Sequence, residues 1–247
     1  MICNSGTAFA ARVDGRRLSF EEEGIFNGVF VMRDRQTKTL WSHFTGEAFD
    51  GPLKGKQLEW IPLDRATYSR AVDTWPDATA PAKHTMRFRG APTQTERSSR
   101  LGESLPGPFV PTLPKEVASK LPRHTHGVGV AVGSSHRFFP LERLFGLEVA
   151  NDEVGGTPVV VMLQDGSASA AVYGRCVDGR TLDFERAEHA GRAALRDTQT
   201  KTVWSATGEA VSGPLKGERL SPARAMITDW YGWGAYFPKS TVWSPPK

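Results

Sequence analysis

The sequence has almost no cysteine. Only Cys3 and Cys176 occur among 247 residues, at places that do not correspond in the repeat described below, which argues against a disulfide framework. Long hydrophobic runs are also missing, since the longest, around Val159–Leu163, is far below the roughly 20 residues of a membrane-spanning helix. The first residues, MICNSGTAFAAR, lack the basic and apolar segments of a signal peptide. These absences predict a chain without disulfide bonds or a membrane-spanning helix.

Concentrated charge of one sign is missing as well. The formal net charge is +4, from 31 basic and 27 acidic residues, and the basic residues are spread along the chain. A nucleic-acid surface needs a basic face with interleaved aromatic residues, so we expect no nucleic-acid partner. No nucleophile motif such as G-x-S-x-G occurs, and no carboxylate pair has the spacing of an acid–base site. We therefore lean towards a protein that is not an enzyme.

What the sequence does contain is a long internal repeat. The stretch RDRQTKTLWSHFTGEAFDGPLKG, Arg33–Gly55, returns with one residue deleted as RDTQTKTVWSATGEAVSGPLKG, Arg196–Gly217. From Arg196 to Leu220, 18 of 25 positions are identical to the first copy. The similarity extends upstream, where RVDGRRLSFE matches RCVDGRTLDFE. We therefore predict one structural unit that occurs twice.

Within each unit the pattern favours strands. Asp-Gly between AFAAR and RLSFE predicts a tight hairpin, because this dipeptide accepts positive φ angles. VFVMRDRQTKTLWS predicts a second hairpin with a polar tip, and GPLKG predicts a turn. LDRATYSRAVDTW and SPARAMITDWYGWGAY predict short helices that stop before Pro76 and Pro238. The predicted fold class is α+β, mostly β: two homologous antiparallel β-rich units, each closed by a short helix.

The two units have different lengths. We predict a first repeat unit at residues 1–80, a proline-rich linker at 81–122 and a second, more complete unit at 123–247. Residues 123–162 of the second unit have no counterpart before the first, so we expect the first unit to be truncated at its N-terminus. We also expect the two repeats to pair with each other within the chain.

Several motifs of the second unit resemble, in order, the bacterial domain of unknown function 3179 family. These motifs are HRFFPLERL, LEVANDEVGGTPVVV, VDGRTLDFE and LRDTQTKTVWSATGEAVSGPLKGERL. The resemblance covers about Val128 to Val242, and its second half also covers Met1 to about Ala80. It implies an exported or periplasmic protein, although the chain shows no signal peptide.

The resemblance also implies a metal or redox site. Family members carry a His-Glu pair before the NDxxGG motif and a Cys-x-x-Cys pair after it, and such ligands hold transition metals. In the second unit these positions are Leu147, Glu148, Val160 and Leu163, so only the glutamate remains. In the first unit Cys3 matches the second cysteine and is the candidate metal ligand of a truncated site.

Other residues are candidates for ligand binding. The repeated motif offers one set in each unit, and the NDEVGG segment with its preceding glutamate offers another. These residues are Arg33, Asp34, Trp41, Arg196, Asp197, Trp204, Glu148, Asn151 and Asp152. For the repeated motif we favour a structural role, an Arg-Asp pair at a hairpin with the tryptophan in the core, because both copies keep it.

Two further groups invite a functional interpretation. His124 and His126 alternate in RHTHG, which would put both rings on one face of a strand, but the sequence shows no third metal ligand nearby. The aromatic segment DWYGWGAY, around Trp230 and Trp233, would form a glycan or peptide platform if it were exposed, although a core position is favoured.

The leading functional prediction is a non-catalytic one. A duplicated domain with a degenerate site would act as a scaffold or binding module. The alternative is a metal-binding or redox protein whose transition-metal site in the first repeat includes Cys3.

Overall fold

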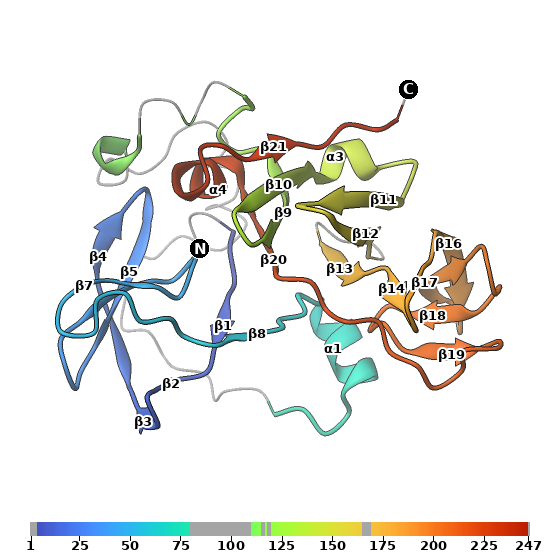
Figure 1. Ribbon diagram of the computed structural model, residues 1–247, viewed down its shortest axis with the longest axis horizontal. Helices are drawn as coiled ribbons and strands as arrows, with labels where there is room; N and C mark the ends of the chain where they lie inside the picture. Colours follow the sequence, from blue (N-terminus) through green and yellow to red (C-terminus); the bar gives the residue numbers. More distant parts are fainter. Residues whose placement is uncertain (1–3, 80–109, 115–116, 118–119, 165–168, 247) are drawn as a thin grey trace.

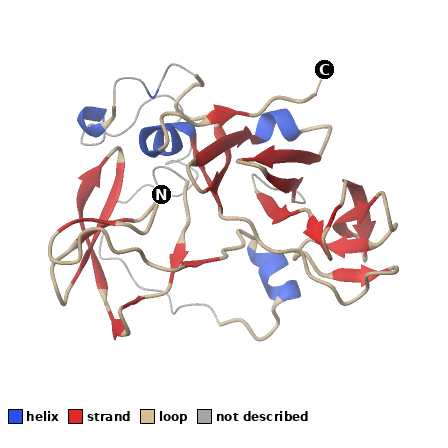
Figure 2. Ribbon diagram, in the orientation of Figure 1, coloured by secondary structure: helices blue, strands red, loops and turns tan. Residues whose placement is uncertain are grey.

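The fold is α+β and mostly β, as predicted. The computed structural model describes residues 4–79, 110–114, 117, 120–164 and 169–246, and strands dominate them (Figure 1, Figure 2). We refer to residues 4–79 as the N-terminal half and to residues 120–246 as the C-terminal half. Within the described residues, no helix is long and apolar enough to span a membrane.

The N-terminal half is built from short antiparallel strands. Its elements are β1 (Ala8–Phe9), β2 (Arg12–Val13), β3 (Arg16–Arg17), β4 (Phe20–Phe26), β5 (Val29–Asp34), β6 (Leu40–Ser42), β7 (Ala48–Asp50), β8 (Trp60–Ile61) and α1 (Tyr68–Thr74). Strands β4 to β7 form one sheet in chain order, while β2 pairs with β3 and β1 with β8. The predicted Asp-Gly turn is present, and Asp14 and Gly15 both have positive φ, 49° and 77°.

The C-terminal half contains a sheet of the same order. Its elements are β9 (His126–Val132), β10 (Ser135–Pro140), α3 (Leu141–Leu144), β11 (Val149–Val154), β12 (Thr157–Leu163), β13 (Ala170–Gly174), β14 (Cys176–Val177), β15 (Arg180–Thr181), β16 (Phe184–His189), β17 (Arg192–Asp197), β18 (Val203–Ser205), β19 (Ala210–Ser212), β20 (Ala225–Asp229), α4 (Trp230–Tyr236) and β21 (Thr241–Val242). Strands β16 to β19 form an antiparallel sheet in chain order, and β14 pairs with β15. The turn Asp178-Gly179 repeats the φ angles of its counterpart, 49° and 74°.

Two more sheets belong to this half. One has the order β20-β9-β10-β21 and the other β11-β12-β13.

The predicted second helix is wrong over its first part, because Ala225–Asp229 is strand β20. This segment pairs along its length with β9, from Ala225 opposite Val130 to Asp229 opposite His126. Pairing with a distant strand overrides the local helical pattern.

The two closing helices differ in burial. In α4 six of the seven residues are buried, beginning with Trp230 and Tyr231. Helix α1 starts after Thr67, whose hydroxyl accepts from the Arg70 amide at 3.2 Å, and it has no buried residue. The helix of the C-terminal half is therefore a core element, whereas its counterpart lies on the surface.

One hydrophobic core draws on both halves. Val29 and Phe44 of the N-terminal half pack in the same cluster as Tyr231 and Trp233 of α4. The rings of Phe44 and Tyr236 stack with centroids 5.0 Å apart. In Figure 1 helix α4 lies beside the N-terminal sheet, between it and the other sheets of the C-terminal half.

Part of the predicted linker joins this core. The described residues include a 3-10 helix at Val110–Thr112, and Val117 and Leu121 are buried in the same cluster. The Thr112 hydroxyl accepts from the Gly28 amide at 2.9 Å. Residues 81–109, 115, 116, 118 and 119 of the predicted linker lie outside the described residues.

Candidate functional site

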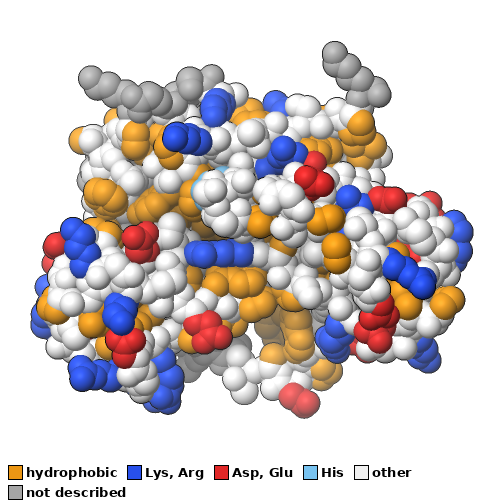
Figure 3. Space-filling model, in the orientation of Figure 1, with side chains coloured by type: hydrophobic (Ala, Val, Ile, Leu, Met, Phe, Trp, Pro, Cys, Tyr) orange, Lys and Arg blue, Asp and Glu red, His pale blue; other side chains and the backbone are white. Residues whose placement is uncertain are grey.

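A cleft runs between the two halves. It has a volume of about 580 Å³, and we call it the interface cleft. The N-terminal half lines it with residues 4–6, 60, 62–66 and 75, and the C-terminal half with 128, 170–173, 207, 222, 223 and 225–227. In Figure 3 hydrophobic side chains gather along the middle of the molecule, between two lobes that carry most of the charged groups on that face. The size and the lining are typical of a small-molecule site.

Small side chains keep the cleft open on the C-terminal side. Ala170 and Ala171 come from β13, and Ala223 and Ala225 lie on or just before β20. On the facing side, larger groups of the N-terminal half complete the wall, including Trp60, which is half-buried. Alanine at these positions leaves space that a larger side chain would fill.

Polar groups occupy one part of this lining. Asp64 is paired with Arg70, and Gln164 donates to it at 3.2 Å. The guanidinium of Arg65 donates to the backbone carbonyl of Asn4 at 3.0 Å. The backbone carbonyl of Arg65 accepts from the Ser169 hydroxyl at 3.1 Å, which ties this segment to the C-terminal half.

Asn4 connects the cleft to a cluster of two histidines and one aspartate. Its side-chain amide donates to the two carboxylate oxygens of Asp229 at 3.2 and 3.4 Å. The Nδ1 atoms of His124 and His126 lie 3.3 and 3.0 Å from the same carboxylate, one on each oxygen. We call these residues, Asp229, His124 and His126, the Asp-His cluster.

The geometry fixes the tautomer of both rings. A carboxylate oxygen accepts hydrogen bonds, so each histidine carries a hydrogen on Nδ1 and directs Nε2 away from Asp229. The Nε2 atom of His124 is buried and has no hydrogen-bond partner among the described residues. The hydrogen-bonding capacity of this nitrogen is therefore not satisfied by any described residue.

The metal interpretation of the two histidines finds only partial support. The structure supplies a third group, Asp229, which sequence reasoning missed because it lies about a hundred residues away, on β20. However, the described residues contain no group of three or more His, Cys, Asp or Glu that could hold a metal ion. Cys3, the predicted ligand, lies outside the described residues, although Asn4 follows it directly in the sequence.

The repeated motif forms the same hydrogen-bonded arrangement in both halves. The carboxylate of Asp34 accepts from the Trp41 indole at 2.9 Å and from the Thr37 amide at 2.5 Å. Its counterpart Asp197 accepts from Trp204 at 3.1 Å and from the Thr200 amide at 2.5 Å. Both aspartates and both tryptophans are fully buried: Asp34, Trp41, Asp197 and Trp204.

The expected Arg-Asp pair at this hairpin is wrong. Arg33 points to the other face of β5 and pairs with Glu21 at 2.8 Å and Glu23 at 2.9 Å. Arg196 likewise lies 3.9 Å from Glu185. Neighbouring residues of a strand point to opposite faces, so the arginine meets solvent and the aspartate meets the core.

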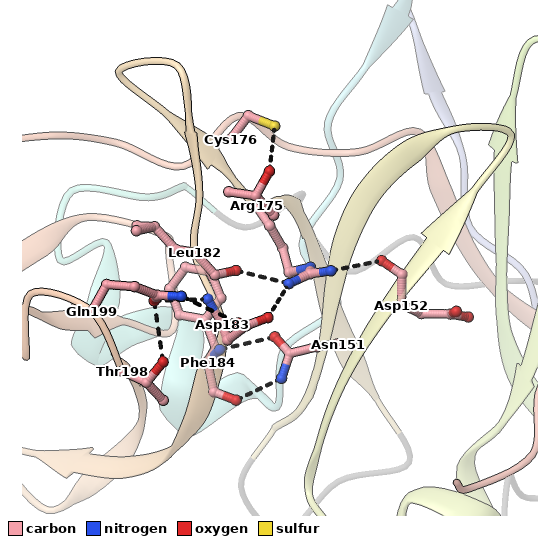
Figure 4. A network of polar contacts seen from close by, with 10 residues as sticks. Asn151, Asp152, Arg175, Cys176, Leu182, Asp183, Phe184, Thr198 and Gln199 are labelled. Atoms are coloured by element: carbon pink, nitrogen blue, oxygen red, sulfur yellow. Dashed lines mark hydrogen bonds and ion pairs between the residues drawn. The ribbon is translucent and has the colours of Figure 1, made fainter.

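The candidate residues in and before the NDEVGG segment have partners within the chain. The side chain of Asn151 donates to the Phe184 carbonyl at 2.8 Å and accepts from its amide at 2.9 Å, which joins β11 to β16 (Figure 4). Asp152 pairs with Arg137 at 2.6 Å, and Glu148 lies 3.4 Å from Arg186. These three residues have separate partners.

The other positions at which the family resemblance implies metal ligands hold apolar residues, and these residues differ in burial. Val160 is buried in the core and Leu147 is largely exposed. The core position favoured for the aromatic segment agrees with the structure, because Trp230, Tyr231 and Trp233 are buried in the shared core. An aromatic surface for glycans would need these rings at the surface.

Two titratable groups near the cleft have shifted pKa values. Burial raises the pKa of Tyr173, with a further increase from Asp64, and its hydroxyl donates to the Ala206 carbonyl at 2.7 Å. Burial lowers the pKa of His43, whose Nδ1 lies 2.6 Å from the Phe30 carbonyl. Both groups are held in their neutral forms by their surroundings.

The fold and the cleft define a mostly β protein with a ligand-sized cavity between two halves that carry similar sheets. Residues 1–240 match the family model DUF3179, a protein of unknown function, and the chain therefore belongs to this family. The match spans both copies of the repeat. No curated protein and no solved structure gives a significant match.

Proposed function

We propose that this protein is a non-catalytic binding module. Two homologous β-rich units pair within the chain, and the interface cleft between them takes a small, mostly apolar ligand. The observation that carries this proposal is the cavity of about 580 Å³, whose lining comes from both halves. Pairing would therefore create a site that neither unit has alone.

Matching backbone geometry supports the homology of the units. The two four-stranded sheets have the same order, and Lys38 and Lys201 both have a φ of 62°. In each unit a glycine with positive φ packs on a threonine: Gly51 on Thr39 and Gly213 on Thr202. A side chain at either glycine would meet the threonine backbone at less than 3 Å.

Contacts between the halves support the pairing. Arg224 donates to the Thr45 carbonyl at 2.6 Å, and Arg192 pairs with Asp73 at 3.0 Å. Together with the shared core, these contacts fix the two walls of the cleft. In the second unit, apolar residues stand at positions where the family resemblance implies metal-ligating side chains. This fits a scaffold that kept its fold and lost its metal-ligating residues.

The test is calorimetric titration of the purified protein with decan-1-ol, an uncharged apolar probe. We expect saturable binding at one site, and we expect Ala171→Phe, which fills the cleft, to abolish it. Circular dichroism and the melting temperature would verify that the variant is folded. Ala170→Leu is a milder variant with the same expected direction. Absence of binding to the unmodified protein, or unchanged binding to both variants, would contradict the proposal.

A metal-binding or redox function is the second candidate. The observation in its favour is that Asn4, the residue after Cys3, bonds to the carboxylate of the Asp-His cluster. Elemental analysis of the chain, of a chain extended upstream in its reading frame, and of Cys3→Ser variants of both would test it. About one equivalent of a transition metal that Cys3→Ser removes would support this candidate. Metal-free proteins throughout would eliminate it.

A further inference from the structure

Arg65 is a cation in the apolar lining of the interface cleft. One of its guanidinium nitrogens donates to the Asn4 carbonyl at 3.0 Å. Within the described part of the chain, Arg65 forms no ion pair. The adjacent carboxylate, Asp64, is already engaged by Arg70 and Gln164.

Among the described residues, most other partly buried arginines have an acidic partner. Arg33 pairs with Glu21, Arg137 with Asp152, and Arg175 with Asp183. Arg143 is a second exception, since it donates to the Trp243 carbonyl and to the Ser244 hydroxyl, but it does not line the cleft. Arg224, which is exposed and donates to the Thr45 carbonyl, does not line it either. Arg65 is thus the arginine whose charge faces the cleft without a counter-ion.

A guanidinium has five N–H donors in a planar fork, and it matches a carboxylate with two parallel hydrogen bonds. Arg65 uses one nitrogen for the Asn4 carbonyl, so further donors remain for a ligand. In surroundings of low polarity, an ionic hydrogen bond of this kind is stronger than in water. The remaining lining is largely alanine, valine, proline and aromatic side chains, which suits an apolar body.

We propose that the ligand of the interface cleft is a monocarboxylate with an apolar body, and that Arg65 binds its carboxylate. This inference rests on the proposed binding function. The chemistry is shared by aliphatic and aromatic acids, and the probes below distinguish these two sources.

The experiment compares matched probes by calorimetric titration of the full chain. Decanoate, decan-1-ol and decylamine share one body and differ in the head group, while 4-phenylbutyrate has an aromatic body. We expect decanoate to bind roughly 10- to 100-fold more tightly than decan-1-ol, the range for a charge-assisted hydrogen bond. Decylamine should bind most weakly, because its charge is repelled by Arg65. Tighter binding of 4-phenylbutyrate would indicate an aromatic acid.

Three variants test whether Arg65 causes the preference for decanoate over decan-1-ol. Arg65→Gln should remove the preference for decanoate and leave the affinity for decan-1-ol within about twofold, whereas Arg65→Lys should keep part of the preference. Arg219→Gln is the matched control, because Arg219 is exposed and pairs with Glu209 at 2.9 Å, away from the cleft lining. It should behave as the unmodified protein.

The outcomes separate the two proposals. If decanoate and decan-1-ol bind equally well, or if Arg65→Gln keeps the preference, the role of Arg65 is overturned while the binding function stands. If none of the probes binds, both the binding function and this inference are overturned. A loss of decan-1-ol binding in Arg65→Gln would show that Arg65 only holds the cleft open, which also overturns its proposed role.

Discussion

Asp34 and Asp197 show how hydrogen bonds can outweigh the effect of burial on the pKa of a carboxyl group. Burial by itself raises the pKa of Asp34, but hydrogen bonds from Trp41, Thr37 and Thr39 outweigh it, so the pKa is lowered. The same balance, with Thr200 and Trp204 as the main donors, lowers the pKa of Asp197. Each carboxylate joins a hairpin loop to a core tryptophan, which explains why the two copies agree at these positions.

We expect Asp34→Asn and Asp197→Asn each to lower the free energy of unfolding by about 1–3 kcal/mol, because one oxygen acceptor becomes an amide donor that faces other donors. Urea unfolding followed by circular dichroism measures this change. Asp50→Asn is the control, since Asp50 is exposed and should shift the midpoint by less than about 0.5 kcal/mol. Equal effects for Asp34 and Asp50 would refute the structural role.

The lowered pKa values also predict a dependence on pH. A carboxyl group with a lowered pKa in the folded state stabilises the fold above its ordinary value of 3.8, and this contribution disappears as the pH falls through the lowered value. The free energy of unfolding should therefore decrease below about pH 4. The double variant Asp34→Asn/Asp197→Asn should show a shallower decrease, measured as urea midpoints from pH 5 to pH 2.5. A parallel decrease in both proteins would contradict the assignment.

Residue identity alone could not reveal the Asp-His cluster. His124 and His126 stood out by their spacing, but Asp229 and Asn4 reach them only through strand pairing and the packing of the two halves. Arg65 carried no signal either, because an arginine in a polar segment is ordinary. Its meaning comes from its place in the cleft lining and from the absence of an acidic partner among the described residues.

At the scale of elements, the hairpins of the two sheets differ in one instructive turn. Asn27 and Gly28 join β4 to β5 with φ angles of 50° and 74°, and Ala190 and Gly191 join β16 to β17 with 52° and 71°. Asparagine accepts this left-handed conformation, whereas alanine adopts it at a cost. The C-terminal hairpin therefore contains a strained residue that the N-terminal one avoids.

Ala190→Asn should accordingly stabilise the protein by about 0.5–1 kcal/mol, since it relieves this strain. The reciprocal change, Asn27→Ala, should destabilise it by a similar amount. Thermal unfolding followed by calorimetry would detect shifts of opposite sign. Shifts of the same sign in both variants would show that the backbone conformation does not determine the effect.

The elements themselves were largely predictable where local signals sufficed. The Asp-Gly turns, the hairpin formed by β5 and β6, and the helix stops before Pro76 and Pro238 all follow from turn chemistry. The strand β20 was missed because its conformation depends on β9, almost a hundred residues earlier. Helical spacing of apolar residues cannot reveal a distant partner strand.

At the scale of the whole molecule, the shared core predicts that the two halves unfold together. Phe44 comes from the N-terminal half, yet it stacks on Tyr236, and Gly232 of α4 leaves room for its ring. Val117 and Leu121 complete the same cluster. The repeat in the sequence could not show that one core would draw on both halves.

Phe44→Ala should lower the free energy of unfolding by about 3–5 kcal/mol, the usual cost of removing a buried phenylalanine. Unfolding curves from circular dichroism and from tyrosine and tryptophan fluorescence should coincide and shift together. Phe145→Ala, at a site 61% exposed, is the matched control and should have little effect. Two separate transitions in the unmodified protein would show that the halves are independent.

The distribution of the tryptophans means that their fluorescence can report whether the interface cleft is occupied. Of the seven, Trp41, Trp204, Trp230, Trp233 and Trp243 are buried. The other two, Trp60 and Trp75, both line the interface cleft. A water-soluble quencher such as iodide should therefore quench the fluorescence of the two cleft tryptophans alone. A molecule that fills the cleft should protect these tryptophans from the quencher. The fraction of quenchable light would then measure occupancy without any label.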